Sequence, residues 1–213
     1  MKNSIIIAAI FMVVQINVHA TLGARPDHQL LLSGPHLIKD AALSLEWTRD
    51  ANLAKTLCQS GDPLWKSFDP TRIPGSTGRS ASEICAQEGR MNWYEANAWL
   101  DHLNTNRYLG YSNWRMPQIS YQDSSCSEQV TLEATGETVA LGSGCMTGEP
   151  GNLKSALNDY QNSFANLEEQ LFWSGTELAT DSRLVGVFGV RNDWQDAEDK
   201  SSDLLPVWPV HSL

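Results

Sequence analysis

The octapeptide Gly110–Pro117, with the sequence GYSNWRMP, constrains the fold more than any other part of this chain. It places a large aromatic side chain, Trp114, and a permanent cation, Arg115, shortly after a glycine. Pro117 restricts the residue before it to an extended conformation. Trp114 favours burial, whereas the guanidinium of Arg115 stays charged and needs acceptors wherever it lies. We therefore expect Trp114, Arg115 and Pro117 to be structural residues held by tertiary contacts.

Residues 1–20 have the pattern of a signal peptide. Lys2 precedes a short apolar run, residues 5–14, and Val18-His19-Ala20 is a small-x-small cleavage signal. The run is too short for a membrane span, and we expect none in the mature chain. Cleavage near Ala20 would direct the protein to the periplasm or the exterior. The alternative is an uncleaved N-terminal anchor.

The charge of the chain disfavours several classes of partner. It has 15 basic and 25 acidic residues, a formal net charge of −10, and its lysines and arginines are scattered singly. Long-range attraction to nucleic acid, anionic membranes or sulfated polysaccharides is therefore not expected. The sequence leaves the oligomeric state open.

The four cysteines, Cys58, Cys85, Cys126 and Cys145, predict two disulfides, because an even count is typical of exported proteins. None of them has the spacing of a zinc ligand. Three pairings are possible. We expect Cys58–Cys85 and Cys126–Cys145, since each would close a segment rich in Gly, Ser or Pro. Each closure would stabilise the fold by roughly 3 kcal/mol.

Hydrophobic patterning predicts an α+β domain over residues 43–213, after a loose lead-in over residues 21–42. The clearest helix begins after Asn92, which forms a capping-box pattern with Glu95. A shorter helix is expected over residues 153–160. Strands are expected over residues 42–48, 171–176, 184–190 and 206–210, and loops or hairpins over residues 59–90, 118–151 and 193–203.

Several short motifs occur in a recognisable order: Leu45-Glu46-Trp47, Asp50–Ala54, Gly89–Trp93, Tyr111–Pro117, Phe172–Glu177 and Trp208–Val210. This order resembles the Lcl C-terminal domain family from about Leu45 to the end of the chain. The resemblance implies an exported bacterial protein with a C-type-lectin-like fold, in which two helices pack on short, twisted antiparallel sheets with long loops. The namesake members are adhesins that bind sulfated glycans through a basic surface. The present chain differs in its negative charge and in having no collagen-like repeat.

The resemblance also implies roles for individual residues. Glu177 and Asp50 lie in family-like motifs, and we expect one of them to bind Arg115. The tryptophans of the family pattern are expected in the core: Trp47, Trp93, Trp114, Trp173 and Trp208.

Trp194 is the best candidate for a ligand-binding aromatic residue, because its neighbours in sequence are polar and charged. We expect it to be exposed in a loop, with Asn192, Asp193 and Asp196 as hydrogen-bonding groups. The alternative is a loop tryptophan that folds back onto the domain.

No cofactor or metal is expected. Glu149–Asn152 and Asn192–Trp194 are similar to calcium motifs of C-type lectins, but one carries an extra glycine and the other has a different order, so calcium is only the alternative. Glu95 and Asp101 are expected to be solvated on the long helix. No nucleophile motif accompanies the histidines of the mature chain, His28, His36, His102 and His211.

These observations predict an exported binding domain that recognises a glycan or a protein at the cell envelope through loops around residues 178–203. The alternative is a structural domain of the envelope or extracellular matrix that has no small ligand. An enzyme is the third and least favoured class.

Overall fold

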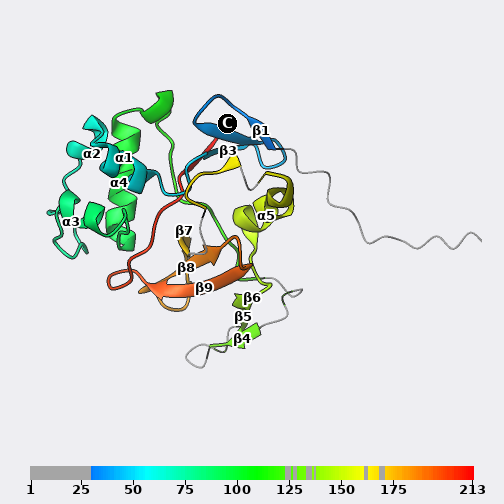
Figure 1. Cartoon of the computed structure of the whole chain (residues 1–213). Coiled ribbons are helices and arrows are strands. Elements are labelled where there is room, and N and C mark those ends of the chain that lie inside the picture. Colours follow the sequence, from blue (N-terminus) through cyan, green and yellow to red (C-terminus); the bar gives the residue numbers. More distant parts are fainter. Residues whose placement is uncertain are drawn as a thin grey trace, which may run out of the picture.

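The computed structural model describes residues 30–122, 126, 129–132, 136, 138–160, 163–167 and 171–213. The expected signal peptide therefore lies outside the described residues. Within those ranges, none of the helices is both long enough and apolar enough to cross a membrane. Figure 1 shows helices α1–α4 gathered on one side of the molecule and the strands, with α5, on the other.

The first sheet has the strand order β1-β2-β3-β10 and is antiparallel throughout. Its strands are β1 (Leu30–Leu32), β2 (Leu37–Asp40), β3 (Leu45–Thr48) and β10 (Val210–Ser212). The lead-in expected to be loose thus supplies two strands. β3 begins later than predicted because Asp40 Oδ1 accepts the N–H groups of Ala42 and Leu43, which organises a turn. β10 lies mostly after the predicted strand over residues 206–210.

The second sheet has the order β6-β9-β8-β7, again antiparallel. It contains β6 (Gly142–Ser143), β7 (Phe172–Glu177), β8 (Leu184–Gly189) and β9 (Trp194–Asp199). β7 and β8 confirm the predicted strands. The prediction of a loop or hairpin over residues 193–203 is wrong, because residues 194–199 form strand β9, which pairs with both β8 and β6. A separate pair consists of β4 (Gln129–Thr131) and β5 (Thr138–Ala140).

The helices are more numerous than the two that the resemblance implies. They are α1 (Leu53–Ser60), α2 (Pro63–Lys66), α3 (Ala81–Ala86), α4 (Trp93–Thr105), the 3₁₀ turn η1 (Tyr108–Gly110) and α5 (Gly148–Tyr160). The loop predicted over residues 59–90 therefore contains α2 and α3. Asn92 and Glu95 form the expected capping box of α4. The α+β class is confirmed.

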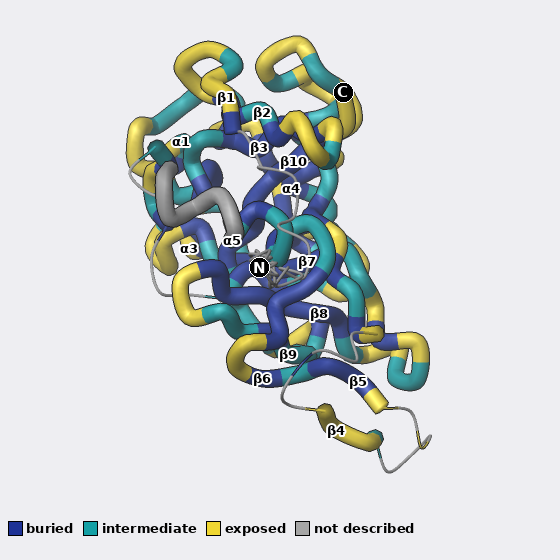
Figure 2. The backbone as a smooth tube through the Cα atoms, turned by 90° about the vertical axis from the view of Figure 1, so that its right-hand side faces the viewer, coloured by how far each residue is buried: buried dark blue, intermediate teal, exposed yellow. Residues whose placement is uncertain are grey.

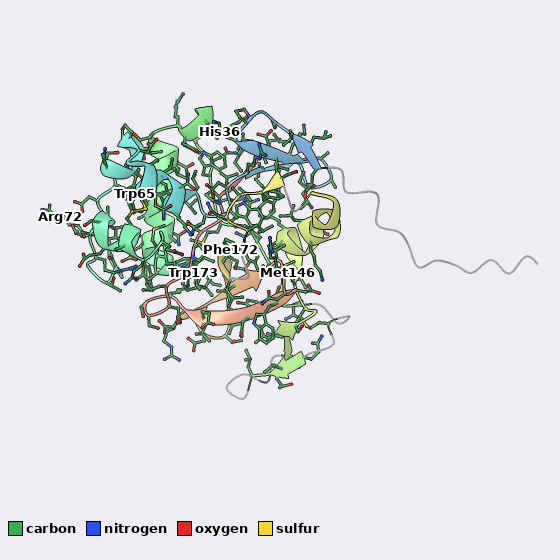
Figure 3. The ribbon with its side chains drawn as sticks, in the orientation of Figure 1. His36, Trp65, Arg72, Met146, Phe172 and Trp173 are labelled. Carbon is green, nitrogen blue, oxygen red and sulfur yellow. A yellow bond between two sulfur atoms is a disulfide. The ribbon has the colours of Figure 1, made fainter. Side chains whose placement is uncertain are left out.

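The second sheet lies between two hydrophobic clusters. Phe172 and Phe188 belong to a sheet-side cluster with Trp47 and Trp208, whereas the next residue, Trp173, belongs to a helix-side cluster around α4. Alternation along a strand sends such neighbours to opposite faces, and Figure 3 labels both Phe172 and Trp173. Figure 2 shows buried backbone along β7 and β8 and an exposed β4.

Both predicted disulfide pairings are confirmed. Cys58–Cys85 joins α1 to α3 with a Cα–Cα distance of 5.6 Å, and Cys126–Cys145 has a Cα–Cα distance of 4.9 Å. Two intramolecular disulfides fit a compartment that is oxidising.

The GYSNWRMP segment is held from three sides. Asn104 of α4 binds both the N–H and the carbonyl of Trp114, and the backbone of Arg115 pairs with Val210 of β10. The carbonyl of Pro117 accepts the N–H of Gly175 at 2.8 Å. These contacts hold the segment in place, and the structural role expected for its residues stays a prediction. The partner expected for Arg115 is wrong, because its guanidinium binds Glu149 of α5 through both terminal nitrogens, at 2.8 and 2.6 Å.

Candidate functional site

Trp194 is the first residue of strand β9, not a loop residue. It pairs with Gly189 of β8 on one side and with Ser143 of β6 on the other. Because side chains alternate along a strand, Trp194, Asp196 and Glu198 share one face of the sheet. These three residues define what we call the β9 face.

Trp194 differs from the other tryptophans in its packing. Seven of the eight tryptophans belong to the sheet-side or helix-side cluster or pack against one of them. Four tryptophans of the family pattern are buried as expected: Trp47, Trp114, Trp173 and Trp208. Trp93 is half-buried against the helix-side cluster. Among the described residues, Trp194 joins neither cluster and is half-buried.

The β9 face combines an aromatic ring with carboxylates. Trp194 Nε1 donates to Asp196 Oδ2 at 3.3 Å, and Asp196 Oδ1 accepts the N–H of Ala197 at 2.8 Å. Burial raises the pKa of Glu198, and the nearby carboxylates of Asp203 and Asp196 raise it further. The face is therefore acidic, and its aromatic ring is held beside an acceptor for hydroxyl groups.

The other two predicted site residues lie at the turn before β9. Asp193 has a positive φ of 55° and forms an ion pair with Lys154 of α5, so its carboxylate is already engaged. Asn192 is exposed, and its side chain lies so close to Gly189 that a Cβ at that glycine would clash with it. The structure thus brings Trp194 and Asp196 together and assigns Asp193 to an ion pair.

Gln195 supports the β9 face from the opposite side of the strand, and the sequence prediction missed it. Its side chain is fully buried, donates to the carbonyls of Ser120 and Ala140 at 2.9 Å, and accepts from the N–H and hydroxyl of Thr147. These four bonds tie β9 to the segment before α5. Alternation with Trp194 was the available signal, but it required β9 to be recognised as a strand.

The two calcium-like motifs have other roles in the fold. Glu149 is the second residue of α5, binds Arg115, and accepts the N–H of Gln118 at 2.8 Å. Asp193 binds Lys154. Across the parts of the chain that the structure describes, there is no group of three or more His, Cys, Asp or Glu side chains suited to a metal ion.

One serine–histidine contact does occur, between Ser67 Oγ and His102 Nε2 at 3.1 Å. The same nitrogen lies 2.9 Å from the carbonyl oxygen of Leu64, to which only a protonated nitrogen can donate. It therefore cannot accept a proton from Ser67, and the pair is not a nucleophile and its base. His28 lies outside the described residues.

No protein-family model, no curated protein and no solved structure matches this chain.

Proposed function

We propose that this chain is an exported bacterial binding domain that recognises a neutral glycan through the β9 face. The observation that carries the proposal is the position of Trp194, a tryptophan outside both core clusters that is hydrogen-bonded to Asp196. A sugar ring presents apolar C–H groups that stack on an aromatic ring, and its hydroxyls donate to a carboxylate. The acidic neighbours Glu198 and Asp203 disfavour a sulfated ligand.

The resemblance to the Lcl C-terminal domain family, with its C-type-lectin-like fold, is part of the same proposal. It is supported by the contact between two of the motifs, since the carbonyl of Pro117 accepts the N–H of Gly175. Just after the first motif, the carbonyl of Ile119 also accepts from Thr176 Oγ1 at 2.9 Å. The two disulfides support export. Because the charge differs from that of the basic adhesins, we assign a neutral rather than a sulfated ligand.

A glycan array with neutral and acidic sugars, run with and without calcium, tests the proposal. We expect saturable binding of a neutral glycan that does not depend on calcium. Replacing Trp194 with Ala should weaken binding by about thirtyfold, because truncating an aromatic anchor costs about 2 kcal/mol. Trp194→Phe, which keeps a ring but removes the Nε1 bond to Asp196, should weaken binding less.

The melting temperature of each variant separates binding from folding. Trp194→Ala should change it little, since Trp194 is in neither cluster. A large loss of stability with unchanged affinity per folded molecule would show that Trp194 is a core residue. No binding to any glycan on the array would favour a structural role in the envelope or matrix.

A further inference from the structure

A hollow of about 320 Å³ lies where the β2 and β3 ends meet α1 and the 3₁₀ turn η1. Its lining combines five polar or charged side chains with the apolar Leu53 and Leu57 of α1. Figure 3 shows one of the five, His36, between the helical side of the molecule and the first sheet. The others are Arg49, Asp50, Thr56 and Tyr108. Its volume is at the low end of the range for small-molecule sites.

Arg49 contributes unused donors to this hollow. Its backbone N–H bonds the carbonyl of His36 at 2.7 Å, and its Nε donates to the carbonyl of Ser163 at 2.6 Å. The bond from Nε holds the guanidinium in place. Its two terminal nitrogens have no hydrogen-bond or ion-pair partner in the described part of the chain. The two terminal nitrogens of a guanidinium can donate to both oxygens of one carboxylate, which is the bidentate arrangement.

Asp50, the carboxylate in the hollow, is occupied by local donors. It accepts the side-chain amide of Asn166 at 2.7 Å, the N–H of Asn52 at 3.0 Å and the hydroxyl of Thr56. It was one of the two residues considered as a partner for Arg115, but these contacts hold it just before α1 instead. Asp50 therefore balances the charge of Arg49 without competing for its terminal nitrogens.

Tyr108 and His36 add two further polar groups. Burial raises the pKa of Tyr108 to about 12, and the charges of Asp50 and Asp62 contribute, so its hydroxyl stays protonated and can donate. The Tyr108 hydroxyl and the exposed His36 ring have no hydrogen-bond partner among the residues described. The unengaged polar groups of the hollow are thus predominantly donors.

We propose that this hollow binds the carboxylate of a small organic acid, with the terminal nitrogens of Arg49 on its two oxygens. Tyr108 and His36 donate to the same carboxylate or to its substituents, and Leu53 and Leu57 contact the apolar part. The charges of Arg49 and Asp50 cancel, and the whole chain carries a formal charge of −10, so the hollow suits a single negative charge rather than a polyanion. This site is separate from the β9 face and goes beyond the function proposed above.

Calorimetric titration of the full chain with four probes tests the proposal. D-Glucuronate represents a sugar acid and N-acetylglycine an amino-acid-derived carboxylate, whereas D-glucose lacks the carboxylate and inorganic sulfate carries a double charge. We expect binding of at least one carboxylate and none of glucose or sulfate. The better of the two acids identifies the source of the carboxylate.

Matched variants place the binding in the hollow. Arg49→Gln should weaken the affinity for the acid by about tenfold or more, because the charge-assisted bidentate bonds are lost. Arg72→Gln makes the same change at an exposed arginine outside the hollow and should leave affinity unchanged. If Arg49→Gln does not fold, His36→Gln and Tyr108→Phe still test the site, and each should weaken binding by a few fold.

The proposal is overturned if wild-type protein binds neither acid, or if glucose or sulfate binds as tightly as the acids. Equal affinity in wild type and in folded Arg49→Gln overturns it as well. Trp194→Ala should not alter binding of the acid, so failure here and failure of the β9 proposal are distinguishable.

Discussion

Two arginine–glutamate pairs anchor loops to the starts of helices, and they differ in burial. Glu95 at the start of α4 has a fully buried side chain and accepts from five groups: the hydroxyl and N–H of Thr77, the hydroxyl of Ser76, the N–H of Asn92 and the guanidinium of Arg79. Glu149 of α5 accepts from Arg115 and from the N–H of Gln118. The side chains of Arg115 and Glu149 are 33% and 19% exposed.

The difference shows how solvent sets the importance of the same chemical pair. Water can replace the lost partner of a half-exposed Arg115, so its pair contributes little more than other surface ion pairs. Water does not reach the Glu95 side chain, so removing its charge leaves the mostly buried guanidinium of Arg79 without its carboxylate partner. We therefore expect the two pairs to respond very differently to equivalent substitutions.

The largest expected effect is that of Glu95→Gln. Breaking a buried ion pair costs about 3 kcal/mol or more of the free energy of unfolding, which denaturant titration measures. Asp101→Asn is the matched control, because it makes the same change at an exposed position of the same helix. It should change stability by no more than about 0.5 kcal/mol. Equal effects of the two variants would contradict the role assigned to Glu95.

Arg115→Met should have an intermediate effect. The variant keeps an unbranched side chain against the segment but loses the bidentate bond to Glu149, for which we expect a loss of about 1 kcal/mol. This corresponds to a fall in melting temperature of about 2–4 °C for a chain of this size. Arg72→Met, at an exposed arginine, is the control. A loss as large as that of Glu95→Gln would show that exposure does not govern the comparison.

The smallest effect concerns pH. Burial alone would raise the pKa of Glu95, but bonds from Asn92, Arg79 and Ser76 outweigh it and hold the pKa below the ordinary 4.5. A carboxyl group whose pKa is lower in the folded state stabilises the fold at pH values above its unfolded-state pKa. This stabilisation is lost as the pH falls through the folded-state pKa. We therefore expect unfolding free energy to fall with pH below about 4.5, less steeply in Glu95→Gln than in wild type. Parallel curves would contradict the assignment.

Features that depend on neighbouring residues were predictable from the sequence. The capping box at Asn92 and Glu95 needs only residues within one turn, and β7 and β8 follow from runs of apolar residues. Both disulfides join cysteines close in sequence, at separations of 27 and 19 residues. The choice among three pairings succeeded because short loops lose little entropy on closure.

Features that depend on distant segments were not predictable in the same way. β9 is polar in sequence and becomes a strand because β8 and β6 pair with it. Glu95 was expected to be solvated, as Asp101 is, but the loop carrying Ser76, Thr77 and Arg79 covers it. No local pattern reveals such a cover.

The candidate sites divide along the same line. The sequence by itself determined that Trp194 lies among polar neighbours, that the chain is acidic and that Arg115 needs acceptors wherever it lies. Only the tertiary structure decided that Trp194 begins a strand beside Asp196, that Arg115 binds Glu149, and that Arg49, Tyr108 and His36 meet in one hollow. The physical reason is that residue type and local order set what a side chain needs, whereas the partner that satisfies it comes from whichever distant segment packs nearby.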